Sequence, residues 1–207
     1  MKNTKKNNNK QINFPNVMIN FKTYESATGK DAEKLVKLCS EISKKEKSNI
    51  SCALSNTDLF RCSKYSVPIL SQHLDVEDAG GHTGKTNFKS IIENGANGVI
   101  INHSEDRIPV EKIKTLIQIC KKHKLFSVVC TKTVQESKLV AKLNPDCIAI
   151  EPPELIGGDI SVTTANPKII SNSVKAVKKI SPKIKVLCGA GVKTGLDVRK
   201  ALELGAK

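Results

Sequence analysis

Short apolar runs rich in β-branched residues alternate with amphipathic stretches along almost the whole chain, and this alternation most constrains the fold. Seven runs, each followed by glycine, proline or polar residues, are predicted to be strands: Val17–Phe21, Ile50–Leu54, Val67–Leu70, Val99–Ile101, Phe126–Cys130, Cys147–Ile150 and Ile184–Cys188. Continuous apolar runs indicate strands buried on both faces, as in a parallel sheet covered by helices.

Amphipathic helices are predicted between most of these strands. Their ranges are Ala32–Lys44, Val110–His123, Val134–Leu143, Pro167–Ile180 and Leu196–Leu204. The faces expected to pack on the sheet carry Leu35, Leu38, Cys39 and Ile42 in the first helix, and Ile113, Leu116, Ile117 and Cys120 in the second.

The spacing between strands suits successive strand and helix units. A closed barrel of such units has eight strands, whereas seven can be read here. The chain ends at Leu204-Gly205-Ala206-Lys207, where a loop after the last helix is expected to lead into another strand. Two interpretations remain: an open, doubly wound sheet, or a barrel that lacks its eighth strand.

Composition predicts one globular domain at residues 14–207, preceded by a disordered Asn/Lys-rich tail at residues 1–13. No apolar run approaches the roughly 20 residues of a membrane span, and no secretory signal precedes the domain, so we expect a cytoplasmic protein. The seven cysteines are odd in number and lack C-x-x-C spacing, which favours buried thiols over a metal centre.

The formal net charge of +14 raises the question of a nucleic-acid partner. Outside the tail, however, the lysines are scattered along the predicted helices, and only 3% of the residues are aromatic, which leaves little to stack on bases. We expect a lysine-rich, solvated surface and no nucleic-acid partner.

Reactive residue types follow four of the predicted strands: Asn20-Phe21-Lys22, Asn102-His103-Ser104-Glu105, Glu151, and Gly189-Ala190-Gly191-Val192. The carboxyl ends of parallel strands gather at one edge of a sheet, where ligand sites form. A lysine supplies charge, a histidine can polarise a carbonyl, a glutamate can act as a base, and a glycine-rich turn offers N–H groups to an anion. This set suits a small phosphorylated carbonyl compound.

Glu151 stands between an apolar run and Pro152-Pro153, with Gly157-Gly158 beyond. Apolar surroundings make a carboxylate a stronger base, and a loop of this composition could close over a substrate. The same pattern also describes an ordinary strand end with a solvated glutamate.

Several motifs together resemble the triosephosphate isomerase family, most closely its compact archaeal form, from Asn16 to Ala206. The motifs are Ile19-Asn20-Phe21-Lys22-Thr23-Tyr24, Ser71-Gln72-His73-Leu74-Asp75, Gly80-Gly81-His82-Thr83-Gly84, Ile101-Asn102-His103-Ser104-Glu105, Glu151-Pro152-Pro153-Glu154-Leu155-Ile156-Gly157 and Leu187-Cys188-Gly189-Ala190-Gly191. The resemblance implies a TIM (β/α)8 barrel that is C-terminally incomplete, because its eighth strand would follow Ala206.

The resemblance also implies the chemistry, which is the interconversion of glyceraldehyde 3-phosphate and dihydroxyacetone phosphate without a cofactor or metal. Glu151 would move the proton between two carbons, and His103 would polarise the carbonyl. Lys22 would supply positive charge, Asn20 would bind the substrate, and Glu105 would organise the site beside His103.

Substrate or phosphate binding is assigned in the same way to Asn20, Phe21, Lys22, Ile156, Gly157, Ala190 and Gly191, with a lid at residues 152–160. The family further implies a homodimer or homotetramer in which Thr83 reaches a neighbouring subunit's site.

Some residues depart from the family's pattern. Asp106-Arg107 stands where two arginines are usual, and Gly158-Asp159 replaces Thr-Gly in the lid. The expected absence of the eighth strand makes an inactive barrel fragment one alternative, and another phosphate-binding barrel enzyme is a second. A P-loop at Gly84-Lys85-Thr86 is disfavoured because Ala79 replaces its first glycine.

Overall fold

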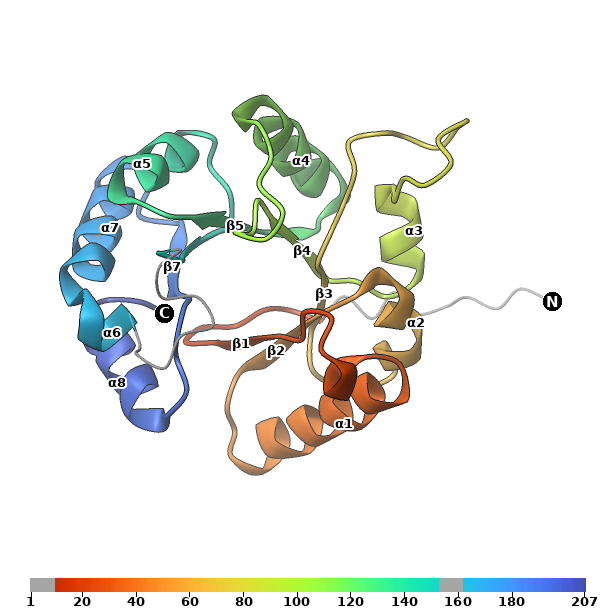
Figure 1. The fold of residues 1–207 in the computed structure, drawn as a ribbon, viewed down its shortest axis with the longest axis horizontal. Helices are drawn as coiled ribbons and strands as arrows, with labels where there is room; N and C mark the ends of the chain where they lie inside the picture. Colours follow the sequence, from red (N-terminus) through yellow and green to blue (C-terminus); the bar gives the residue numbers. More distant parts are fainter. Residues whose placement is uncertain (1–9, 153–161) are drawn as a thin grey trace. The chain divides into compact units, whose positions relative to one another are not determined.

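The computed structural model describes residues 10–152 and 162–207. The chain divides into two compact units, residues 1–99 and residues 100–207. Each unit repeats a parallel strand followed by one or more helices, as the ribbon in Figure 1 traces.

The first unit contains β1 (Val17–Asn20), β2 (Ile50–Leu54) and β3 (Ile69–Ser71), and β4 (Gly98–Ile101) crosses its boundary. These strands pair in chain order, and every pairing is parallel. Its helical segments are η1 (Glu25–Ala27), α1 (Lys30–Lys45), η2 (Asn56–Asp58), α2 (Leu59–Cys62) and α3 (Phe88–Glu93). The long helix α1 packs against β2.

The second unit contains β5 (Phe126–Thr131), β6 (Cys147–Ile150) and β7 (Lys185–Cys188), paired in parallel and in chain order. Its helices are α4 (Val110–His123), α5 (Val134–Lys142), α6 (Val162–Ala165), α7 (Pro167–Ile180) and α8 (Gly195–Glu203). Helices α5 and α7 pack side by side (Figure 1). After α8 the chain returns to the sheet, where the Lys207 N–H donates to the Val186 carbonyl at 2.9 Å.

All seven predicted strands and all five predicted helices are confirmed, with ends that differ by at most two residues. The helices that the sequence did not predict are short: α2 and α6 have four residues each and α3 has six. A helix of one or two turns is too short to show a 3.6-residue period, so its pattern cannot be told from a loop.

Burial of the strands on both faces is also confirmed. Every residue of β2, β4 and β6 is buried, and Leu54, Ile69, Ile148 and Ile150 are among the largest fully buried side chains. Strand β1 differs, because Val17 remains 41% exposed.

The packing face predicted for α1 is wrong. Of its four predicted residues only Cys39 is buried, whereas Leu38 is 49% exposed. The buried stripe is instead Ala32, Val36, Cys39 and Ser40, small side chains that let the helix lie close to β2. In α4 the predicted face, from Ile113 to Cys120, is confirmed.

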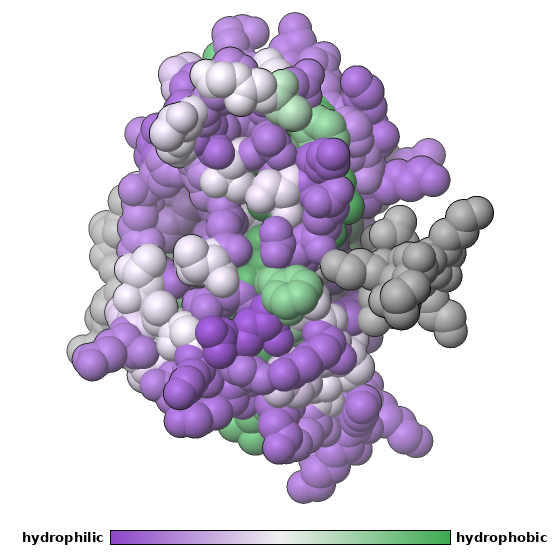
Figure 2. Space-filling model, turned by 90° about the vertical axis from the view of Figure 1, so that its right-hand side faces the viewer, coloured by the Kyte–Doolittle hydropathy of each residue, from purple (hydrophilic) through white to green (hydrophobic). Residues whose placement is uncertain are grey.

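Hydrophilic residues cover most of the face shown in Figure 2. Among the described residues, no helix has the length and apolar character that a membrane crossing requires. Of the tail predicted at residues 1–13, the last four residues are described. Ile12 is 7% exposed, and the Lys10 ammonium donates to the Ser63 carbonyl at 2.8 Å, so ordered packing begins before residue 14.

Two truncations on α1 test which face packs inward. We expect Val36→Ala to lower the free energy of unfolding by about 2 kcal/mol, because Val36 is fully buried. Leu38→Ala removes a larger side chain from an exposed position and should cost less than about 0.5 kcal/mol. Urea unfolding measures both values, and a larger loss for Leu38→Ala would contradict this orientation of α1.

Candidate functional site

In the first unit, the carboxyl end of β1 carries the predicted residues Asn20, Phe21 and Lys22. Phe21 is 3% exposed, and its N–H donates to the Ala53 carbonyl at 3.0 Å, which extends the parallel ladder. The side-chain oxygen of Asn20 accepts the Lys22 N–H at 3.0 Å and the Gln72 amide at 3.1 Å. The end of β1 is therefore joined to the residue that follows β3.

Lys22 has a φ of +50°, in the left-handed region that a residue with a Cβ seldom adopts. Gln72 supports this conformation, since its side-chain nitrogen also lies 3.1 Å from the Lys22 carbonyl oxygen. Backbone strain of this kind concentrates at functional sites. Gln72 was part of a recognised motif, but the sequence assigned it no role in the site.

In the second unit, His103 follows β4, and its side chain is 12% exposed. Its Nδ1 accepts the Glu105 N–H at 3.2 Å, which favours the neutral tautomer with the proton on Nε2. The Glu105 carboxylate lies 3.4 Å from the same Nδ1. The Glu105 backbone N–H thus contacts the imidazole ring on the side away from Nε2.

Glu151 follows β6, and its N–H donates to the Thr131 carbonyl at 2.8 Å. Its side chain is 15% exposed, and Oε2 lies 3.6 Å from Nε2 of His103. The structure therefore brings together the predicted base and the predicted proton donor, both largely shielded from solvent.

Gly189, at the end of β7, makes room for the Glu151 side chain. Its N–H donates to the Ile150 carbonyl at 2.9 Å, so it lies beside Glu151 in the sheet. A Cβ at this position would stand 2.8 Å from Cγ of Glu151 and 2.9 Å from Oε1. The predicted residues Ala190 and Gly191 follow at φ values of 105° and 65°, in the same tight turn.

Cys130, near the end of β5, also contacts Glu151. Burial raises the pKa of its thiol well above the usual value, and the Glu151 charge and a hydrogen bond to Glu151 act in the same direction. The thiol therefore stays protonated and donates to the carboxylate. The sequence predicted only a buried cysteine here, because the contact with Glu151 arises from pairing between β5 and β6.

Not all of the predicted site can be described. Ile156 and Gly157 lie outside the described residues, and of the predicted lid only Pro152, which is buried, falls within them. Within residues 10–152 and 162–207, no cluster of three histidine, cysteine, aspartate or glutamate side chains could hold a metal ion.

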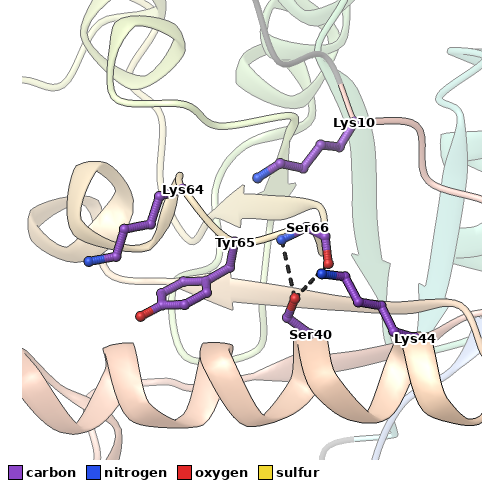
Figure 3. Close-up of a pocket in the computed structure, with 6 residues that line it drawn as sticks. All are labelled: Lys10, Ser40, Lys44, Lys64, Tyr65 and Ser66. Carbon is purple, nitrogen blue, oxygen red and sulfur yellow. Dashed lines mark hydrogen bonds between the residues drawn. The ribbon is translucent and has the colours of Figure 1, made fainter.

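A separate pocket of about 410 Å³ lies in the first unit, lined by Lys10, Ser40, Lys44, Lys64, Tyr65 and Ser66 (Figure 3). Ser66 precedes β3, whereas the predicted site residues follow the carboxyl ends of strands. Lys44 is in the last turn of α1, where positive charge offsets the helix dipole, and Lys64 pairs with Glu33. The charges of this pocket are thus accounted for by the fold, and we place no reaction there.

Comparison with known proteins agrees with these observations. The profile of the triosephosphate isomerase family matches residues 15–207. Triosephosphate isomerase of Methanothermus fervidus is 42% identical over 93% of this chain and 87% of the relative. The enzyme of Methanothermobacter thermautotrophicus is 44% identical over 93% of this chain and 85% of the relative. The enzyme of Methanosarcina barkeri is 43% identical over 95% of this chain and 89% of the relative.

A solved structure shares the fold. The crystal structure of triosephosphate isomerase from Bartonella henselae superposes with a TM-score of 0.68 over 91% of this chain and 87% of that one, at 20% identity. The fold is thus that of the (β/α) TIM barrel, and seven of its strands lie in the described residues. The open, doubly wound sheet is thereby excluded.

The backbone strain at Lys22 can be measured by comparing the stabilities of glycine and alanine variants, because glycine should be the more stable of the two there and the less stable within a helix. We expect Lys22→Gly to be more stable than Lys22→Ala by about 0.5–1 kcal/mol, because the left-handed region costs an alanine about 1–2 kcal/mol. At Lys114, exposed within α4, glycine should instead be less stable than alanine by about 1 kcal/mol. Thermal unfolding of the four variants gives both differences, and the same sign at both positions would argue against strain.

Proposed function

We propose that this chain, which belongs to the triosephosphate isomerase family, interconverts glyceraldehyde 3-phosphate and dihydroxyacetone phosphate through an enediolate. The observation that carries the proposal is the pairing of Glu151 with His103, whose Oε2 and Nε2 atoms lie 3.6 Å apart. The family is itself the standard example of a glutamate base working with a neutral histidine, so this mechanism comes from family membership.

In the proposed reaction, the Glu151 carboxylate removes a proton from the carbon next to the carbonyl and returns it to the neighbouring carbon. His103 donates from Nε2–H to the oxygen on which negative charge develops. This role needs a proton on Nε2, and the hydrogen bond from the Glu105 N–H to Nδ1 favours that tautomer. Glu105 is therefore proposed to act by orienting His103.

Lys22 is proposed to provide positive charge for the phosphate and the developing oxyanion, with Asn20 as a hydrogen-bonding partner of the substrate. Strain in the Lys22 backbone supports a functional role, because two hydrogen bonds, from the Lys22 N–H to Asn20 and from Gln72 to the Lys22 carbonyl, hold this conformation. Ala190 and Gly191 are proposed to offer N–H groups to the phosphate, together with Phe21, Ile156 and Gly157.

Exclusion of water supports the same reaction. The side chains of His103 and Glu151 are only 12% and 15% exposed, and electrostatic stabilisation of an enediolate strengthens when water is removed. A lid at residues 152–160 would complete this exclusion and protect the intermediate from losing phosphate.

Assembly and context follow from the family as further proposals: a homodimer or homotetramer in the cytoplasm, acting in glycolysis or gluconeogenesis. The loop proposed to carry Thr83 to a neighbouring subunit is closed at its base by Asp75, whose carboxylate accepts the Thr86 N–H at 2.8 Å and the Lys85 ammonium at 3.1 Å. Lys85 and Thr86 are thus engaged with Asp75, which argues against a P-loop at Gly84-Lys85-Thr86.

The base is tested by Glu151→Gln. We expect kcat for glyceraldehyde 3-phosphate to fall at least about 10³-fold, because an amide cannot accept the carbon-bound proton. Glu111→Gln, which removes an exposed carboxylate from α4, should leave turnover unchanged. A coupled assay of the purified chain gives both numbers. Wild-type activity no higher than that of Glu151→Gln would reject the proposed function and favour an inactive barrel.

Gly189→Ala tests the fit of Glu151 against β7. The added Cβ must displace a carboxylate whose atoms would otherwise lie 2.8–2.9 Å away, so we expect kcat to fall about 10–100-fold with little change in KM. Gly195→Ala is the matched control, since a Cβ there meets nothing within 4 Å. Equal turnover of the two variants would show that Glu151 does not depend on this contact.

A further inference from the structure

The loop that carries His103 is closed by contacts around Asn102. The Asp106 N–H donates to the His103 carbonyl at 2.9 Å, which forms a tight turn. The Ile108 N–H donates to the Asn102 side-chain oxygen at 3.1 Å. Because the imidazole is oriented by Glu105, within this same turn, the direction of the ring depends on the path of residues 102–108.

Asn102 itself adopts a constrained conformation. It is 5% exposed and has a φ of +62°, which asparagine tolerates better than most residues. Its amide nitrogen donates to the Cys130 carbonyl at 3.0 Å. Asn102 therefore joins the end of β4 to Cys130 in β5, and the Cys130 thiol contacts Glu151.

Arg107 extends back across the loop to this same residue. Its Nη1 donates to the Asn102 carbonyl at 3.2 Å, while Nη2 forms an ion pair with Oε1 of Glu136 in α5. The planar guanidinium makes both contacts at once, which a lysine could not do.

Glu136 anchors Arg107 to the next strand and helix. Its second oxygen accepts the Lys132 N–H at 2.7 Å, directly after β5, and Oε1 lies 3.4 Å from the Asn102 amide nitrogen. The side chains of Arg107 and Glu136 are 33% and 22% exposed, so solvent screens this pair less than a fully exposed one. The pair is thus part of a network of four residues: Asn102, Arg107, Lys132 and Glu136.

We propose that Arg107 is a positioning residue for His103, held in place by Glu136. Arg107 donates to the Asn102 carbonyl, immediately before His103, and thereby holds the turn at residues 102–108. Within this turn the Glu105 N–H donates to Nδ1 of His103. The effect is to keep Nε2 directed at the space beside Glu151. The inference rests on the proposed function for its kinetic consequence, but the geometry of the imidazole can be tested without turnover.

The kinetic test compares Arg107→Gln with Arg199→Gln, which removes the same charge from an exposed position on α8. We expect Arg107→Gln to lower kcat about 10–100-fold with KM changed less than about threefold, because misplacement of a reacting group by about 1 Å costs on the order of 10²-fold. Arg199→Gln should match the wild type. Arg107→Lys should recover only part of the loss, since one ammonium cannot hold both acceptors.

A double-mutant cycle identifies the partner. If Glu136 acts through Arg107, then Glu136→Gln should lower kcat in the same direction, and the double variant should be no slower than Arg107→Gln alone. Additive losses would assign the two residues separate roles. Glu136→Gln also keeps the proposal testable if Arg107→Gln does not fold.

A spectroscopic readout separates positioning from loss of fold and from failure of the proposed function. The ¹⁵N resonances of His103 in the folded wild type should show a protonated Nε2 and an acceptor Nδ1, and Arg107→Gln should mix the two tautomers. If the wild type lacks isomerase activity, the proposed function fails while this comparison still decides the role of Arg107. Unchanged His103 resonances in folded Arg107→Gln, or a kcat within twofold of the wild type, would overturn the proposal.

Discussion

Backbone hydrogen bonds that continue the parallel ladders past the strand ends decide where the reactive side chains lie. Phe21 donates to Ala53, Glu151 to Thr131 and Gly189 to Ile150, each in the register of the strands before them. A slip of one residue in β6 would turn the Glu151 side chain to the other face of the sheet. Correct pairing of buried apolar strands is therefore the condition for the candidate site.

Immediately beyond these ladders the chain turns sharply, and it does so with residues at positive φ. Lys22 lies two residues after β1, Asn102 is the first residue after β4, and Ala190 and Gly191 lie shortly after β7. Residues with a Cβ carry a conformational cost of about 1 kcal/mol or more in this region, and asparagine carries less than the others. Side-chain amides offset that cost: Gln72 and Asn20 hold Lys22, while Asn102 holds its own turn. The polar networks at these strand ends thus stabilise conformations that the backbone alone would not prefer.

Close packing then determines the chemistry of Glu151. The Glu151 side chain fits against β7 because Gly189 has no Cβ. The protonated Cys130 thiol contacts the carboxylate, and His103 Nε2 lies 3.6 Å from Oε2. These neighbours come from β7, β5 and the loop after β4. A carboxylate surrounded in this way has few alternative positions, which is the preorganisation that the proposed proton transfer requires.

The sequence by itself determined the order and type of the main elements, because seven buried strands and five long helices leave clear periodic patterns. Its motifs indicated Glu151, His103 and Lys22 as candidate site residues. It did not determine which face of α1 packs inward, since larger apolar residues lie beside the small ones that allow close approach to β2. It also did not reveal that Gln72 supports Lys22, that Cys130 and Gly189 contact Glu151, or that Arg107 holds the Asn102 carbonyl. Their roles depend on contacts between residues far apart in the chain, and only the tertiary structure, through strand register and close packing, decided which side chains meet.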